Sequence, residues 1–341
     1  MTGLEVRVLG LAMDSAAVPQ SEQAALNRLL AEQPWSVEGH IRMGDARSKS
    51  GDDDLACYYY RTALRLAETQ ELDALRRSEI VRAERALKGI EARSHAKREA
   101  RLRSRGLPPQ QWSPRLAEAL EIAAGTKELY RQEPTNFTYP GLPSIQFFDT
   151  AEFSWAEQIE GAAPAIRSEL TRFLEAQGTD DFRAYIQGHT VAPEADQALG
   201  RKKDWSVLSL CENGWLTPSI VEYFPATWQA ILQAPVPRIA GWGPTIVFSM
   251  LKAGARIAAH NGMFNTRLIC HLPLIVPPGC GFRVGNDVRE WREGKLLIFD
   301  DTIEHEAWNE SDQDRVVLIF DVWRPELSET EKAELTALFS D

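Results

Sequence analysis

The sequence predicts an α+β protein of two domains, an α-helical domain over residues 1–130 and a β domain over residues 137–330. Three observations support this prediction. The chain has 341 residues, which is more than one hydrophobic core usually serves. Apolar residues recur at helical steps in the first part, whereas short apolar runs about ten residues apart fill the second. Strands at that spacing are typical of a barrel or a double-sheet jelly roll.

The first domain resembles a helical-hairpin repeat of the tetratricopeptide kind. The packing residues of such a repeat have counterparts within residues 34–67, with Gly51 at the turn: Met43, Gly44, Ala56, Tyr60 and Ala63. A single repeat cannot bury its own face, so we expect helices at about 21–32 and 73–105 to stack on it. An array of this kind either binds a peptide or protein or serves as a support or dimerisation element, and both readings stay open.

Charge and composition limit the kind of partner. Residues 78–106 read as one basic helix, and the proline- and glycine-containing segment 106–114 reads as a connector. The net charge of −11 disfavours binding to nucleic acid or to an anionic membrane. We find no apolar window that predicts a membrane span and no signal peptide. The four cysteines are scattered, so we expect a cytoplasmic protein without a disulfide framework.

The second domain begins with helical patterns near 154–176 and 219–233 and continues with strands. The strand-like runs are "TIVFSML", "TRLICHLPLIV", "KLLIFDD" and "RVVLIFDVW". They place His260, His271 and His305 on or beside a β scaffold, where inward side chains converge. Histidines on such a scaffold are candidate metal ligands.

His305 and Arg315 are separated by the polar turn "NESDQD". We expect His305 to lie near the end of one strand and Arg315 to start the next, on antiparallel neighbours that share one interior. A buried guanidinium is unfavourable unless it meets an anion. Arg315 therefore indicates a bound carboxylate.

Residues 139–327 resemble the aspartyl/asparaginyl β-hydroxylase family of Fe(II)- and 2-oxoglutarate-dependent oxygenases. The matching segments, in order, are "FSMLKAGARIAAHNG", "NTRLICHLPLIVP", "WREGKLLIFDDTIEHEAWN" and "RVVLIFDVWRPELS". The resemblance implies a double-stranded β-helix, which is a jelly-roll variant. It also implies that the protein uses Fe(II), 2-oxoglutarate and O2.

The resemblance assigns roles to five residues. His260 and His305 match the two iron ligands, and Arg315 matches the arginine that pairs with the distal carboxylate of 2-oxoglutarate. Ser249 matches a serine that assists there, and His271 matches a histidine that lines the co-substrate site without binding iron. We expect His271 on a strand that neighbours the one carrying His260. Imidazoles suit Fe(II), and an arginine fork suits a carboxylate.

At two positions this sequence differs from related enzymes. Gly262 stands where most enzymes of the wider class carry a carboxylate ligand. This family lacks that acid, and a vacant coordination position would also accept the chloride of a halogenase. Ile269 replaces a second arginine of the animal enzymes, whereas Arg267 is retained. Arg267 is expected at the co-substrate or substrate side, with Trp205 and His189 as further substrate-side candidates.

The resemblance thus predicts a dioxygenase that hydroxylates the β-carbon of Asp or Asn residues in a peptide or protein, or a related small amino-acid substrate. Recruitment of the peptide or protein is one of the two roles open to the helical domain, and no nucleic-acid or membrane partner is expected. The alternatives are an iron- and 2-oxoglutarate-dependent halogenase and a catalytically silent helical-repeat binding protein.

Overall fold

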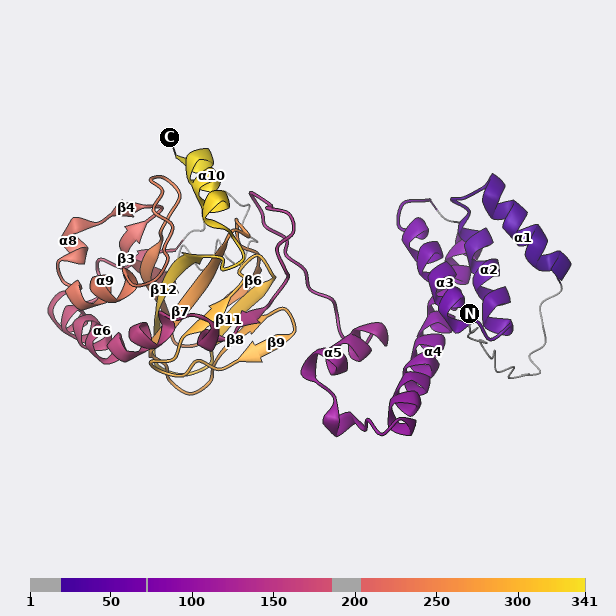
Figure 1. Cartoon of the computed structure of the whole chain (residues 1–341), viewed down its shortest axis with the longest axis horizontal. Helices are drawn as coiled ribbons and strands as arrows, with labels where there is room; N and C mark the ends of the chain where they lie inside the picture. The colour runs from indigo at the N-terminus through magenta and orange to yellow at the C-terminus, as the bar shows by residue number, and fades with distance from the viewer. Residues whose placement is uncertain (1–19, 72, 186–203, 341) are drawn as a thin grey trace, which may run out of the picture. The chain divides into compact units, whose positions relative to one another are not determined.

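The computed structural model describes residues 20–71, 73–185 and 204–340. The chain divides into two compact units, Met1–Glu128 and Leu129–Asp341 (Figure 1). The sequence placed the corresponding domains at 1–130 and 137–330. The second unit starts before residue 137 and contains a final helix, α10 (Glu329–Phe339).

The first unit is α-helical, as the sequence predicts. Each of α2, α3, α4 and α5 begins after a Ser or Asp whose side chain accepts a backbone N–H three residues ahead. Consecutive helices from α1 to α4 pack against each other. The helices are α1 (Gln20–Glu32), α2 (Val37–Lys49), α3 (Asp53–Ala67), α4 (Ala74–Ser104), the 3₁₀ turn η1 (Pro109–Gln111) and α5 (Pro114–Ala123).

The α2–α3 hairpin has the packing expected from its sequence. Met43, Ala56 and Ala63 are fully buried between the helices. A Cβ at Gly44 would lie 2.8 Å from the Tyr60 ring, so only glycine lets this ring approach α2 so closely. The helical hairpin is therefore present, whereas its assignment to the tetratricopeptide class stays a prediction.

The second unit contains two antiparallel sheets. The larger sheet has the order β1-β10-β7-β12-β5-β3-β2, with β4 paired to β3, and the smaller sheet has the order β6-β11-β8-β9. The larger sheet consists of β1 (Phe147–Phe148), β2 (Arg183–Ala184), β3 (Trp205–Glu212), β4 (Trp215–Leu216), β5 (Ile246–Leu251), β7 (Arg267–Ile275), β10 (Leu297–Phe299) and β12 (Arg315–Trp323). The smaller sheet consists of β6 (Arg256–His260), β8 (Cys280–Val284), β9 (Asp287–Arg289) and β11 (His305–Asn309). This is the jelly-roll, double-stranded β-helix architecture that the sequence predicts.

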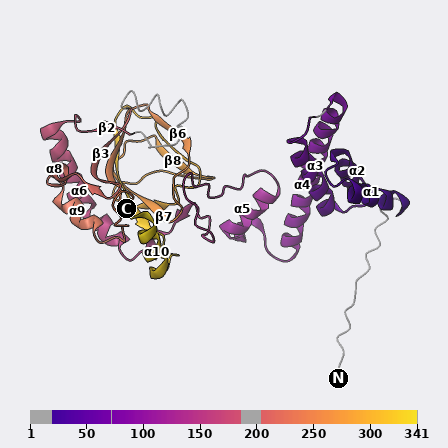
Figure 2. The same ribbon diagram turned by 90° about the horizontal axis from the view of Figure 1, so that it is seen from above.

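Helices cover the outer face of the larger sheet (Figure 2). Alternation along β5 divides its residues, so that Ile246, Phe248 and Met250 pack in the core beneath the helices. Val247 and Ser249 point the opposite way, toward the smaller sheet. The helices of this unit are the 3₁₀ turn η2 (Thr150–Glu152), α6 (Ala156–Gln177), α8 (Pro218–Val221), α9 (Pro225–Ile231) and α10.

The last helix, α10, closes an aromatic cluster at one edge of the sheets. Phe339 stacks on Trp242 with ring centroids 5.2 Å apart and meets Phe264 edge to face at 5.5 Å. Trp242 also stacks on Trp323 at the end of β12. The cluster ties α10 to the larger sheet.

Two expectations about strand pairing are wrong. His305 begins β11 instead of ending a strand, and β11 pairs with β6 and β8, whereas β12, which starts at Arg315, pairs with β5 and β7. The turn between His305 and Arg315 crosses from one sheet to the other, as consecutive strands of a jelly roll do, so the two strands are not neighbours. Likewise, His260 on β6 and His271 on β7 lie in opposite sheets.

A candidate metal and co-substrate site

A cavity of about 310 Å³ lies between the two sheets. All of the predicted site residues that the structure describes line it, although they come from strands of both sheets. These residues are Trp205, Ser249, His260, Arg267, His271, His305 and Arg315. His189 lies outside the described residues. The fold therefore brings side chains that are spread between positions 205 and 315 of the sequence together around one cavity.

His260 and His305 are direct partners across the β6–β11 pair, and their ring centroids are 4.1 Å apart. The Nδ1 of His260 donates to the carbonyl of Ala258 at 2.7 Å, and that of His305 donates to Ile303 at 3.1 Å. A carbonyl oxygen only accepts, so each neutral ring carries its proton on Nδ1 and its lone pair on Nε2. Burial and the neighbouring His260 hold the pKa of His305 well below its usual range. Two neutral imidazoles so arranged suit a transition metal such as Fe(II).

Asp301 fills the space in front of Gly262. The backbone N–H of Gly262 donates to the Asp301 carbonyl at 2.6 Å, and a Cβ added at Gly262 would overlap with the Asp301 carboxyl group. Burial raises the pKa of Asp301 to about 7. Across the described residues, no three or more His, Cys, Asp or Glu side chains are placed to hold a metal ion. Asp301 therefore accompanies the histidine pair without joining it as a third ligand.

Arg315 places a buried positive charge in the cavity. Its side chain is 1% exposed, and its Nε and Nη1 are buried without a hydrogen-bond partner within the described part of the chain. Burial lowers the pKa of this guanidinium to about 10. An unpaired buried cation of this kind is unfavourable unless a ligand supplies an anion. Arg315 therefore fits a bound carboxylate.

Ser249 lies on β5, close to Arg315 at this end of the cavity. Its Oγ accepts a hydrogen bond from the indole Nε1 of Trp205 at 3.1 Å. Strand register places Val207 opposite Ser249 on one side and Val317 on the other. The hydroxyl is thus oriented by Trp205, and its own proton remains available to a carboxylate.

His271 faces the same chamber from β7, where its register partners are Ile319 and Leu297. Its Nδ1 lies 3.3 Å from the indole Nε1 of Trp291. Burial and the charge of Arg315 hold the pKa of His271 well below its usual range. A neutral imidazole on the sheet opposite His260 agrees with a role toward the co-substrate.

Arg267, at the other end of the cavity, differs from Arg315 because it already has an anionic partner. One Nη of Arg267 donates to Asp321 at 2.8 Å, and Asp321 also accepts the backbone N–H of Thr245 at 2.6 Å. The guanidinium lies 5.5 Å from the Trp242 ring and 5.4 Å from the Phe264 ring. Its Nε has no hydrogen-bond partner among the described residues. One N–H of Arg267 thus remains for a substrate or co-substrate oxygen.

The sequence interpretation did not identify Trp291 or Asp321. An aspartate inside the apolar run "RVVLIFDVW" is a usable signal, because a buried acid requires a partner. Trp291 lies in the irregular segment between β9 and β10, where no periodicity marks an inward side chain.

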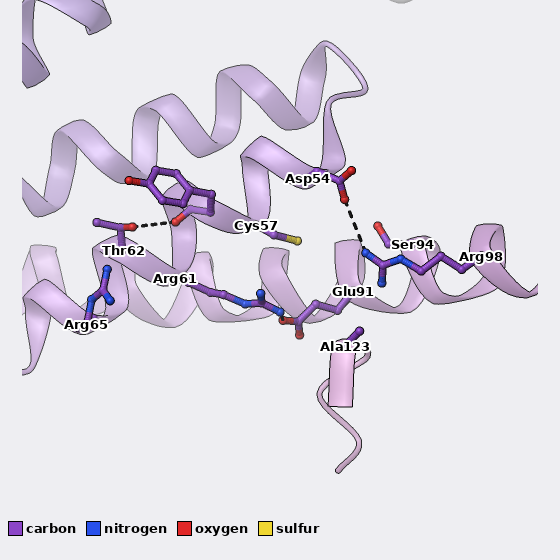
Figure 3. Close-up of a pocket in the computed structure, with 10 residues that line it drawn as sticks. Asp54, Cys57, Arg61, Thr62, Arg65, Glu91, Ser94, Arg98 and Ala123 are labelled. Carbon is purple, nitrogen blue, oxygen red and sulfur yellow. Dashed lines mark hydrogen bonds and ion pairs between the residues drawn. The ribbon is translucent and has the colours of Figure 1, made fainter. Parts of the chain in front are cut away.

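A second hollow, of about 550 Å³, lies in the first unit among α3, α4 and α5. Figure 3 shows Arg61 directed toward Glu91 and Arg98 toward Asp54, and the N···O distances of these ion pairs are 2.7 and 3.6 Å. These charges neutralise each other within the hollow. We therefore assign it no ligand.

Residues 161–325 match the sequence model of the Aspartyl/Asparaginyl beta-hydroxylase family. The second unit belongs to this family. The family match thus includes His260, His305 and Arg315 and every strand of the two sheets except β1.

Curated relatives of this β-hydroxylase unit differ in what they act on. An ornithine lipid ester-linked acyl 2-hydroxylase of Rhizobium tropici is 36% identical over 196 residues, 57% of this chain and 66% of that protein. The human aspartyl/asparaginyl beta-hydroxylase is 35% identical over 144 residues, 42% of this chain and 19% of that protein. Each match spans less than two thirds of the relative's length. A solved cupin domain from Bordetella pertussis, at 14% identity, covers 24% of this chain and 82% of that chain with a TM-score of 0.20.

Among the helices that the structure describes, none combines the length and the apolar character needed to cross a bilayer. The cytoplasmic location stays a prediction.

Proposed function

We propose that this protein is an Fe(II)- and 2-oxoglutarate-dependent oxygenase that hydroxylates the β-carbon of an Asp or Asn residue. The observation that carries the cofactor part of the proposal is Arg315, a buried guanidinium without a carboxylate partner among the described residues, in the same cavity as the two paired histidines. A dicarboxylate co-substrate satisfies that charge. One oxygen atom of O2 enters succinate and the other enters the product hydroxyl group. The co-substrate loses CO2 as it is converted to succinate.

Different residues would bind the metal and the co-substrate. His260 and His305 would hold Fe(II), which supplies the activation of O2 when it is bound. Arg315 and Ser249 bind and orient the distal carboxylate, and His271 positions the rest of the co-substrate. Orientation of this kind is what the protein adds to chemistry that belongs to the cofactor.

Asp301 favours hydroxylation over halogenation. A halogenase needs a chloride where the glycine leaves a coordination position open. Here the Asp301 carboxyl group occupies the space next to Gly262. A carboxyl group beside this position, once ionised, disfavours a chloride through repulsion between like charges.

The Rhizobium relative provides a second candidate substrate, the acyl chain of a lipid, because its name gives an acyl 2-hydroxylase. Ile269 also lines the cavity where the animal enzymes carry a second arginine, and Val247 and Ile319 add aliphatic surface nearby. A wall of this composition suits a carbon chain as well as the methylene group of an asparagine.

The test is succinate formation by purified protein with Fe(II), 2-oxoglutarate and O2. We expect slow turnover without a second substrate, stimulated by an Asp- or Asn-containing peptide. Stimulation by an acylated amino-acid lipid instead would select the second candidate. Absence of 2-oxoglutarate turnover under all conditions would favour the catalytically silent binding protein.

We further propose that the helical unit recruits a peptide or protein substrate. The α2–α3 hairpin and α4 form a packed array, the kind of structure that commonly binds peptides. A protein without residues 1–128 is expected to retain substrate-independent succinate formation while its turnover of the physiological substrate falls. Equal rates on that substrate would assign the helices a supporting or dimerising role.

A further inference from the structure

Trp291 contacts two of the three groups at the anion-binding end of the cavity, although it lies on no strand. Its side chain is 5% exposed and stacks on Phe282, with ring centroids 5.4 Å apart and planes inclined by 18°. The Arg315 guanidinium carbon lies 4.5 Å from the centroid of the indole. The indole Nε1 lies 3.3 Å from Nδ1 of His271. The Trp291 side chain therefore contacts one residue of β12 and one residue of β7, although Trp291 belongs to neither strand.

The contact with His271 determines where the proton of that imidazole resides. An indole N–H can only donate, so Nδ1 of His271 must accept. A neutral imidazole whose Nδ1 accepts carries its single proton on Nε2. His271 is buried beside a guanidinium, which keeps the ring neutral. The ring therefore has its donor at Nε2.

This is the opposite tautomer to that of the two metal-binding candidates. The Nδ1 atoms of His260 and His305 donate to backbone carbonyls, so their lone pairs are on Nε2. An Nε2 lone pair binds a metal, whereas an Nε2–H binds an oxygen acceptor. The partner of Nδ1 therefore separates the two kinds of histidine in one cavity.

The contact with Arg315 acts on the second group. The guanidinium lies over the face of the indole, whose quadrupole attracts a cation. With Nε and Nη1 lacking a hydrogen-bond partner among the described residues, the indole face fixes the plane of the fork. A planar fork held in place is suited to bidentate binding of a carboxylate.

We propose that Trp291 is a positioning residue for the dicarboxylate co-substrate, because it fixes His271 as an Nε2–H donor and holds the Arg315 guanidinium in plane. This role rests on the proposed function, since it requires 2-oxoglutarate to bind at Arg315 and His271. Trp291 itself need not touch the co-substrate.

The tautomer is tested on metal-free protein by ¹⁵N NMR of labelled histidines, with His271→Ala to assign the signals. We expect wild-type His271 to show an unprotonated Nδ1 and a protonated Nε2. Trp291→Phe keeps an aromatic ring but removes the N–H, so His271 should shift to a mixture of tautomers. Trp308→Phe is the matched control, because Trp308 also contacts an arginine, Arg256 at 5.3 Å, and that arginine does not line the cavity.

Co-substrate affinity is tested by anaerobic calorimetry of the Fe(II)-loaded protein with 2-oxoglutarate. Trp291→Phe should weaken 2-oxoglutarate binding by about tenfold, as expected for a misplaced hydrogen-bond donor, and should leave Fe(II) affinity unchanged. In the substrate-independent assay KM for 2-oxoglutarate should rise more than kcat falls. Trp308→Phe should match wild type in both.

The outcomes separate the two proposals. If wild type binds 2-oxoglutarate and Trp291→Phe has the wild-type affinity and His271 tautomer, the role of Trp291 is wrong and the proposed function stands. If wild type does not bind 2-oxoglutarate, the proposed function is wrong and this role with it. Loss of Fe(II) in Trp291→Phe would also contradict the proposal, because it would place Trp291 in support of the metal instead.

Discussion

The two sheets around the cavity contribute different chemistry. The smaller sheet supplies the histidine pair, His260 and His305, from adjacent strands in direct register. The larger sheet supplies Ser249, His271 and Arg315, the residues proposed to bind the anionic co-substrate, from β5, β7 and β12. The histidine pair is thus positioned by backbone pairing, whereas these three residues are oriented by side-chain contacts with two tryptophans.

This difference has a physical consequence. Backbone register tolerates little adjustment, because a shift of one residue turns a side chain to the other face. Side-chain contacts can weaken by degrees. Substitutions on the smaller sheet should therefore abolish the site, whereas those on the larger sheet should reduce its affinity in steps.

The largest effect is expected for the histidine pair. His260→Ala or His305→Ala removes one of the two imidazoles, and the described residues place no third ligand beside them, so each variant should lose most of its Fe(II). Turnover should fall more than about 100-fold, beyond what loss of a supporting residue causes. Iron content and succinate formation measure both effects. Retention of full iron content by either variant would contradict the assignment of the smaller sheet to the metal.

Arg315→Ala should act on the co-substrate and not on the metal. Loss of two charge-assisted bonds of roughly 1.5 kcal/mol each predicts about 100-fold weaker 2-oxoglutarate binding. Calorimetry measures this affinity, and iron content should stay at the wild-type level. Arg256→Ala, at an exposed arginine outside the cavity, is the control. An unchanged affinity in Arg315→Ala would remove Arg315 from the site.

His271→Ala tests whether the larger sheet takes part in metal binding. The variant should bind Fe(II) normally while its turnover drops about tenfold through poor placement of 2-oxoglutarate. The measurements are the same as for His260→Ala, taken side by side. Metal loss as complete as that of His260→Ala would instead indicate a three-histidine centre formed by both sheets.

The last effect concerns Asp301, which lies beside the histidine pair, and it bears on stability instead of on cofactor binding. Burial raises its pKa from an ordinary value near 3.9 to about 7. Between these values the folded protein binds more protons than the unfolded chain, so this group contributes stability below about pH 4 that is lost as the pH rises to 7. Wild type should therefore lose stability relative to Asp301→Asn by at most about 1.4 kcal/mol per pH unit in this window, with no further change above it. Urea denaturation of the metal-free proteins at pH 5, 6, 7 and 8 measures the difference, and a difference independent of pH would contradict it.

Much of this architecture is predictable from local sequence. The apolar runs at 245–251, 266–276 and 315–323 coincide with β5, β7 and β12, because alternating or continuous apolar character marks a strand. The position of Arg315 inside the cavity was also predictable, because it starts the apolar run of a buried strand. A single charged residue within an apolar strand can thus be recognised from the sequence.

The pairing of strands could not be predicted in the same way. His305 and Arg315 are separated by a short polar turn that reads as a hairpin, but the chain uses it to change sheets. Nothing in the periodicity distinguishes the two cases, because both place an apolar strand after a turn. The same limit applies to Trp291, whose position depends on how an irregular segment folds back over the sheets.

The cluster closed by α10 gives the final helix an influence that its distance from the histidines conceals. Phe339 stacks on Trp242, and Trp242 lies against the guanidinium of Arg267 at the far end of the cavity. Position 339 is thus separated by one ring stack and one cation–π contact from Arg267, which is proposed for the substrate side. A substitution in the last helix is therefore expected to reach the chamber through this chain of contacts, without a change in any residue that lines it.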